Sequence, residues 1–133
     1  MKIGVTGTRE GMNEAQFEQV KQFLEQHKGA ELHHGDCRGV DVEVAFMAKE
    51  MGYKIICHPP KSKAQQGFFG GDEVREPKGY LERDRAIVDE TELLLVVPLQ
   101  NERQDKGGTW YTYDYALKTG KTVHMCYPGE KTK

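Results

Sequence analysis

The sequence has few of the residues that mark disulfide-rich or membrane-spanning proteins. It holds three cysteines among 133 residues, an odd number without paired spacing, so no disulfide framework is expected and a cytoplasmic location is favoured. The amino-terminal residues lack a charged stretch followed by an apolar one, and we expect no signal peptide. The longest apolar run, 93–99, is interrupted by Pro98 and is too short to span a bilayer, so no membrane partner is expected.

An excess of positive charge is also missing. The chain has 19 Lys and Arg against 21 Asp and Glu, a formal net charge of −2, and 37% hydrophobic residues. Proteins that bind nucleic acid through bulk electrostatics usually have a basic excess, so the composition argues against nucleic acid as a partner. Any bound anion must be held locally, by a few placed groups. The length and the apolar content fit one domain over 1–133.

Short β-rich segments alternate with helical segments along the chain. The expected strands are 2–6, 30–34, 53–58, 93–97 and 121–127, and the expected helices are 13–29, 40–51, 79–90 and 109–119. This order predicts an α/β, Rossmann-like three-layer domain with a doubly wound, mainly parallel sheet of about five strands. Residues 61–78 are predicted to be a long loop of the lid or binding type, and 128–133 a frayed tail.

Three turns that follow strands combine glycine with threonine or arginine. They are residues 6–9 (TGTR), 35–41 (GDCRGVD) and 107–109 (GGT). Glycine lets a ligand approach the backbone closely, helix N-termini present free N–H groups to anions, and threonine and arginine add donors that suit phosphate. The carboxyl ends of parallel strands meet at one edge, where ligands bind in such sheets. Each turn alone fits an ordinary structural turn, but their convergence favours a phosphate-binding site.

These segments resemble the motifs of the SLOG superfamily, which contains Rossmann-like nucleotide-binding domains related to the DNA-processing protein DprA and to the LOG phosphoribohydrolases. Residues 6–9 resemble its TGSR turn, 34–41 (HGDCRGVD) its HGGARGAD segment, 83–85 (RDR) its RNR element, and 107–112 (GGTWYT) its GGTxxT turn. The resemblance covers nearly the whole chain and implies a small stand-alone nucleotide-binding domain.

The chain departs from the family at three positions, one of which is Glu92, where the family has an aspartate. LOG hydrolases have a catalytic glutamate two residues after the threonine of their PGGxGTxEE motif, and the matching residue here is Tyr111. The asparagine of RNR is replaced by Asp84. The LOG mechanism therefore does not carry over, and the sequence leaves open whether the protein is an enzyme.

Thirteen residues are candidates for ligand or phosphate contacts. They are Gly7, Thr8, Arg9, Gly35, Asp36, Arg38, Gly39, Asp41, Arg83, Gly107, Gly108, Thr109 and Thr112. Arg38 is expected on a phosphate, while Asp41 either binds a ribose hydroxyl or caps a helix. Arg83 and Arg85 are two residues apart and do not share a helical face, so at most one faces the cleft, and the family pattern favours Arg83.

The sequence supports three functions. The first is binding of a nucleotide or a nucleotide-derived ligand. The second is N-glycosidic hydrolysis of a nucleoside 5'-monophosphate, which needs a carboxylate near the anomeric carbon. No catalytic residue is fixed, and the candidates are Asp36, Asp41, Glu82 and Asp114. The third is a DprA-like module for single-stranded DNA or a protein partner.

Metal and cofactor signals are weak in this sequence. His33, His34, Cys37 and His58 fall near the ends of two neighbouring strands, but His33 and His34 must point to opposite faces, and no metal-binding spacing is present. We predict no metal site and no cofactor.

Aromatic residues gather in the last helix. Trp110 and Tyr111 lie next to the glycines and are candidates for stacking on a base, whereas Tyr113 and Tyr115 fit a core or interface stripe. These aromatics would suit a homodimer interface, although the sequence does not determine the oligomeric state.

Overall fold

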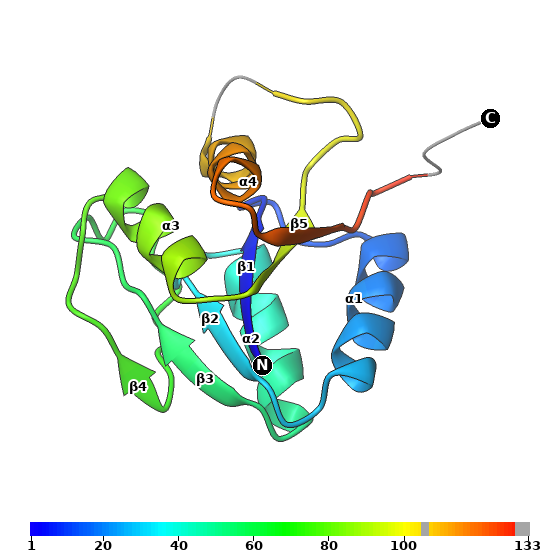
Figure 1. Ribbon diagram of the computed structural model, residues 1–133, viewed down its shortest axis with the longest axis horizontal. Helices are drawn as coiled ribbons and strands as arrows, with labels where there is room; N and C mark the ends of the chain where they lie inside the picture. The colour runs from blue at the N-terminus through cyan, green and yellow to red at the C-terminus, as the bar shows by residue number, and fades with distance from the viewer. Residues whose placement is uncertain (105–106, 130–133) are drawn as a thin grey trace.

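A computed structural model describes residues 1–104 and 107–129 and shows a parallel sheet with helices on both faces (Figure 1). The strands are β1 (Lys2–Gly7), β2 (Glu31–His34), β3 (Lys54–Cys57), β4 (Glu73–Val74), β5 (Leu93–Val97) and β6 (Thr122–Met125). The helices are α1 (Glu14–Gln26), α2 (Val40–Glu50), α3 (Tyr80–Asp89) and α4 (Gly108–Lys118). The predicted Rossmann-like α/β class is confirmed.

The sheet has the order β4-β3-β2-β1-β5-β6, and every pairing is parallel. It has six strands where the sequence predicted about five. The additional strand, β4, lies inside the predicted loop 61–78 and pairs with the end of β3. Both of its residues are exposed and it is two residues long, so it leaves no alternation in the sequence that could reveal it.

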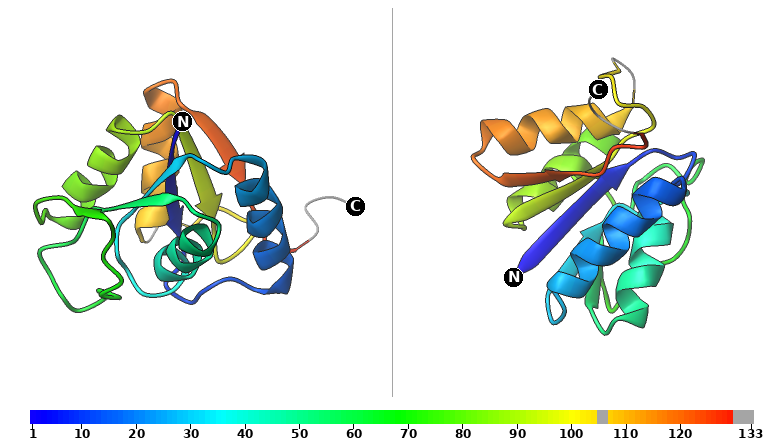
Figure 2. Two further views of the ribbon diagram at one scale, coloured as in Figure 1. Left: turned by 90° about the horizontal axis from the view of Figure 1, so that it is seen from below. Right: turned by 90° about the vertical axis from the view of Figure 1, so that its right-hand side faces the viewer.

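The helices form two layers, with α1 and α2 on one face of the sheet and α3 and α4 on the other (Figure 2). Successive residues of β5 point to opposite faces: Leu95 packs with α1 and α2, while Leu94 and Val96 pack with α3 and α4. All five residues of β5 are buried, as the unbroken apolar run predicts for a strand that is covered on both sides.

The start of α1 is fixed by a capping box, which the spacing of Asn13 and Gln16, three residues apart, already indicates in the sequence. The Asn13 side chain accepts from the Gln16 backbone N–H at 2.9 Å, and the Gln16 side chain accepts from the Asn13 backbone N–H at 3.1 Å. The buried Gln16 amide also donates to the carbonyls of Pro98 and Cys126, at 2.7 and 3.0 Å. These bonds hold α1 against the segments that follow β5 and β6.

The chain end differs in part from the expected frayed tail. Asn13 donates to the Pro128 carbonyl, and the Gly129 N–H donates to Asn101 at 3.3 Å, so residues 128–129 are held in place. The rest of the predicted tail, 130–133, lies outside the described residues. Within 1–104 and 107–129, none of the helices combines the length and the apolar character that a membrane crossing requires.

Candidate functional site

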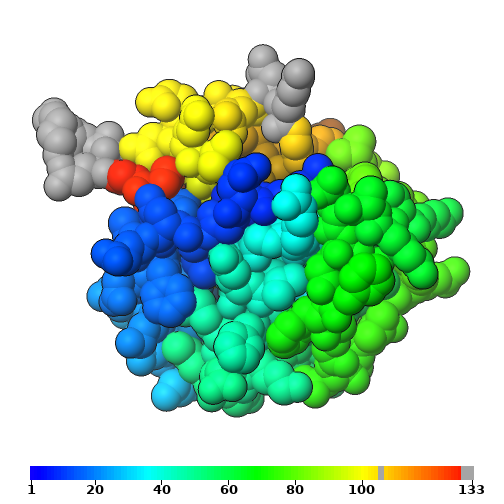
Figure 3. Space-filling model, turned by 180° about the vertical axis from the view of Figure 1, so that it is seen from behind, coloured from blue at the N-terminus to red at the C-terminus, as the bar shows by residue number. Residues whose placement is uncertain are grey.

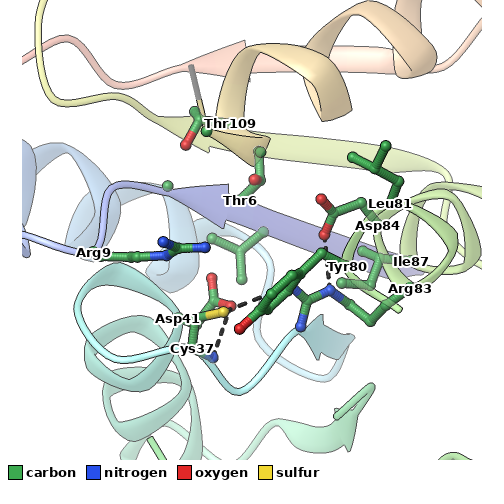
Figure 4. Close-up of a pocket in the computed structure, with 14 residues that line it drawn as sticks. Thr6, Arg9, Cys37, Asp41, Tyr80, Leu81, Arg83, Asp84, Ile87 and Thr109 are labelled. Atoms are coloured by element: carbon green, nitrogen blue, oxygen red, sulfur yellow. Dashed lines mark hydrogen bonds and ion pairs between the residues drawn. The ribbon is translucent and has the colours of Figure 1, made fainter. Parts of the chain in front are cut away.

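A cavity of about 350 Å³ lies at the carboxyl ends of the central strands, between the N-termini of α3 and α4 (Figure 4). A second hollow of about 300 Å³ adjoins it. Both are lined by Gly7, Arg9 and the segment 107–109. The first and third glycine turns of the sequence therefore meet at one site.

Of the thirteen candidate contacts, eight line one or both of these hollows. They are Gly7, Thr8, Arg9, Asp41, Arg83, Gly107, Gly108 and Thr109. The other five, Gly35, Asp36, Arg38, Gly39 and Thr112, are not among the lining residues.

The first two turns are locked together through their backbones. A Cβ at Gly39, whose φ is +88°, would lie 2.5 Å from the carbonyl oxygen of Arg9. The Val40 N–H donates to the Thr8 carbonyl at 3.1 Å. A Cβ at Gly7 would lie 2.5 Å from the Val40 side chain. These glycines therefore serve close packing, and Gly39 acts on the site by holding the turn that carries Arg9.

The remainder of the second turn faces the loop 61–78 rather than the cavity. Asp36 is buried, and its carboxylate accepts from the Phe69 N–H at 2.8 Å and from the Gln66 amide at 3.0 Å. Arg38 is exposed and donates from Nε to the Gln65 side chain at 2.6 Å. Figure 3 shows this loop packed against the second turn and α2. Arg38 is not among the residues that line the two hollows, and its expected phosphate contact stays a prediction.

Asp41 braces the second turn from inside the cavity wall. Its carboxylate accepts from the N–H groups of Gly35 and Cys37, each at 3.2 Å. Burial raises the pKa of this carboxyl. The side chain therefore braces the turn before α2 and lines the cavity, but it does not cap the helix, whose N-cap is Gly39.

Arg83 lies in the cavity wall with its donors largely occupied. It is buried and donates to the carbonyls of Gly35 and His58, the latter at 3.3 Å, and to Asp84 at 2.8 Å. Arg85, by contrast, donates to the Tyr111 hydroxyl at 2.7 Å. The arginine that faces the cleft is thus Arg83, as the family pattern favours, and its bonds brace the second turn.

Asp84 is a cavity residue that the sequence marked only as a departure from the family. Asp84 is 7% exposed, and burial raises the pKa of its carboxyl to about 6 although Arg83 opposes the shift. A Cβ at Gly108 would lie 2.8 Å from its Oδ2. A carboxyl group thus lies beside the first turn of α4, where the family has a neutral amide.

Tyr80 is a second cavity residue that the sequence did not single out, because its place in α3 suggested a core role. The guanidinium carbon of Arg9 lies 5.5 Å from the centre of its ring, and that of Arg83 lies 5.6 Å from it. Within the described part of the chain, Arg9 has no carboxylate partner. Arg9 therefore presents to both hollows a guanidinium that no described carboxylate contacts, although Asp41 and Asp84 line the same cavity.

The N-terminus of α4 closes the opposite wall. It begins after Gly107, whose φ is +88°, and no described side chain caps it. Trp110 lines the second hollow and is 7% exposed, and its indole N–H has no hydrogen-bond partner among the described residues. Thr112 does not line either hollow, and its hydroxyl donates to the Gly108 carbonyl at 2.6 Å.

The candidate catalytic carboxylates do not gather in the cavity. Asp41 alone of the four lines it. Asp36 holds the loop, Glu82 is exposed, and Asp114 is exposed and forms an ion pair with Arg103. Tyr111, at the LOG glutamate position, bonds to Arg85 and is not among the lining residues.

The aromatic side chains of α4 contact other residues of this domain. The Tyr115 hydroxyl donates to Asp89 at 2.8 Å, and Trp110 stacks edge-on against Tyr113. Exposed phenyl groups occur instead on α1 and α2, at Phe17 and Phe46. The homodimer stays a prediction, and the α4 aromatics no longer argue for it.

The fold has counterparts among solved structures. A molybdenum cofactor binding protein from Rippkaea orientalis superposes with a TM-score of 0.72 at 21% identity, over 93% of this chain and 74% of the other. DprA from Streptococcus pneumoniae gives 0.72 at 21%, over 97% of this chain and 50% of the other. The molybdenum cofactor carrier protein of Chlamydomonas reinhardtii gives 0.64 at 23%, over 93% and 75%.

The chain shares the Rossmann-like fold of these three proteins. No family model matches the sequence, and no curated protein matches it either. These structures therefore support the fold that the four SLOG-like motifs imply. They do not identify the ligand of this chain.

Proposed function

We propose that this SLOG domain binds a nucleotide or a nucleotide-derived ligand, with the phosphate in the larger cavity between Arg9 and the start of α4. One observation carries the proposal: among the described residues, a guanidinium without a carboxylate partner and a helix N-terminus without a side-chain cap face the same cavity. Backbone N–H groups at a helix N-terminus and an arginine are the donors that phosphate prefers.

The adjoining hollow suits the base. Trp110 lines this hollow, and its buried N–H calls for an acceptor, because buried polar groups are nearly always hydrogen-bonded. Two of the structural neighbours are described as binding or carrying the molybdenum cofactor. Like a nucleotide, that cofactor joins a phosphate to a heteroaromatic ring system. A ligand of this kind would place its phosphate and its ring system in the same two hollows.

The test is calorimetric titration with AMP, ADP, a pterin phosphate and adenosine, using Arg9→Gln and its matched control Arg38→Gln. Both substitutions remove one positive charge from neighbouring turns, but only Arg9 lines the cavity. Loss of a charge-assisted hydrogen bond weakens binding by about 10–100-fold, so Arg9→Gln should do this while Arg38→Gln changes affinity less than about threefold. Equal losses in both variants, or no binding of any phosphorylated compound, would overturn the proposal.

Hydrolysis of the bound nucleotide is a second candidate, favoured by Asp84. Its pKa of about 6 makes both protonation states accessible near neutral pH, which suits a general acid or base in the cavity. Water would replace the base at the anomeric carbon, giving free base and ribose 5-phosphate. If Asp84 transfers the proton, Asp84→Asn abolishes release of free base from a nucleoside monophosphate while preserving its binding.

A further inference from the structure

A cluster of histidine and glutamate side chains lies under α3, outside both hollows. His33 on β2, His58 just after β3, and Glu90 at the end of α3 each direct one nitrogen or oxygen atom toward the others, and these three atoms all lie within 4.8 Å of one another. Residues 33, 58 and 90 are far apart in sequence, so their spacing could not reveal the group. None of the three lines the proposed nucleotide cavity.

The distances are close to those of a coordination sphere. His33 Nδ1 is 2.9 Å from His58 Nε2 and 4.0 Å from Glu90 Oε1. Ligands around a tetrahedral zinc ion at about 2.0–2.1 Å are separated by about 3.4 Å, which lies between these two values. Small side-chain movements would therefore suffice to place all three atoms around one ion.

The surroundings of His33 match those of a metal-bound imidazole. Its other nitrogen, Nε2, lies 3.1 Å from the Glu31 carboxylate, which fixes the proton on Nε2 and leaves the Nδ1 lone pair facing the cluster. At His58 a change of tautomer would free the Nε2 lone pair in the same way.

The charge and access of the cluster also suit a cation. Glu31 and Glu90 contribute two carboxylates. The nearest positive group, Arg75, donates to Glu90 Oε1 from Nε at 3.2 Å and from Nη2 at 2.9 Å, and to Glu73 at 2.8 Å, so a bound ion would take the place of Arg75 at this oxygen while Arg75 keeps Glu73. The Glu90 side chain is 36% exposed, so one side of the cluster is open to solvent. A water molecule could complete the coordination there.

The second cluster of this kind, His34 with Asp36 and Cys57, is already occupied by protein contacts. His34 Nε2 pairs with the Gly70 carbonyl at 2.7 Å, and its Nδ1 accepts from the Asp36 N–H at 3.0 Å. Both nitrogens of that ring are engaged by the backbone, so it has no lone pair for an ion.

We infer that His33, His58 and Glu90 form a binding site for a first-row divalent cation of the zinc type, with Glu31 orienting His33. Two imidazoles, one carboxylate and an open position form a donor set that zinc accepts. The inference is independent of the proposed nucleotide site.

The experiment titrates protein stripped with EDTA and dialysed, first with Zn²⁺ by calorimetry and then with Co²⁺ by visible absorption. We expect one ion per chain and the visible bands of a four- or five-coordinate Co²⁺ that has nitrogen ligands. Glu90→Gln and His58→Gln should each weaken Zn²⁺ binding at least tenfold, and Glu31→Gln should weaken it about 10–100-fold. The matched control is His124→Gln, which removes an exposed histidine and should leave both signals unchanged.

The partly exposed Glu90 keeps the test decisive if the buried His58→Gln variant does not fold, which circular dichroism would reveal. Absence of a bound ion at micromolar Zn²⁺, or binding that survives Glu90→Gln and is lost in His124→Gln, would overturn the inference. The His33–His58 contact would then be a buried hydrogen-bonded pair and nothing more.

Discussion

Replacing Asp84 by asparagine should stabilise the protein at neutral pH. The folded chain holds the Asp84 carboxyl at a pKa of about 6, because burial outweighs the attraction of Arg83, whereas the ordinary value is 3.8. The folded state therefore binds a proton between these pH values that the unfolded state has lost, and stability falls as the pH rises through this window. The difference corresponds to about 3 kcal/mol once Asp84 is fully ionised in the folded chain.

Asparagine has nearly the shape of the protonated carboxyl and cannot ionise. Asp84→Asn should therefore raise the free energy of unfolding by up to about 3 kcal/mol at pH 7.5, which corresponds to about 10 °C in Tm for a domain of this size. At pH 4 the wild-type carboxyl is mostly protonated as well, and the advantage should disappear.

The assay is urea and thermal unfolding at pH 4, 5.5 and 7.5, followed by circular dichroism. Asp89→Asn is the matched control, because it removes the same charge from an exposed position on the same helix and should change stability by less than about 1 kcal/mol. An Asp84→Asn protein that is less stable than wild type at pH 7.5 would refute the reasoning. The Arg83–Asp84 ion pair would then contribute more than burial of the carboxylate costs.

Three further predictions follow from the packing and charge of the site. Asp84→Asn should also tighten AMP binding at pH 7.5, because it removes a negative charge beside the start of α4. Calorimetry measures this affinity, and weaker binding would contradict the proposed position of the phosphate. Gly39→Ala should lower the Tm strongly, because its Cβ meets the Arg9 carbonyl, whereas Gly79→Ala, with φ of −61° and open space around it, should change the Tm little. Leu94→Ala should reduce the free energy of unfolding by about 2–5 kcal/mol in urea titrations, and a loss below 1 kcal/mol would mean that the α3–α4 layer packs loosely.

Much of the fold could be predicted from local patterns in the sequence. The apolar run at 93–97 indicated a strand covered on both faces, and Asn13 with Gln16 marked the start of α1, because both signals depend on neighbours in sequence. The short edge strand Glu73–Val74 could not be predicted, since pairing with the end of β3 defines it and its own two residues do not.

The site was predictable in its backbone and less so in its side chains. The glycine turns at 6–9 and 107–109 meet because parallel strands bring their ends to one edge. Whether an arginine points into the cavity depends on the partner it finds: Arg38 bonds to Gln65 in the loop, while Arg9 lies over Tyr80. Tyr80 and Asp84 are part of the site because α3 docks beside the cavity, which is a tertiary arrangement that no local pattern encodes.

The most direct test of the proposed nucleotide site is a crystal structure of the protein soaked with AMP. The phosphate should lie within hydrogen-bond distance of the Arg9 guanidinium and of the first backbone N–H groups of α4, with the adenine in the hollow beside Trp110. A nucleotide bound at another surface, with Arg9 still over Tyr80 and the cavity filled by solvent alone, would contradict it.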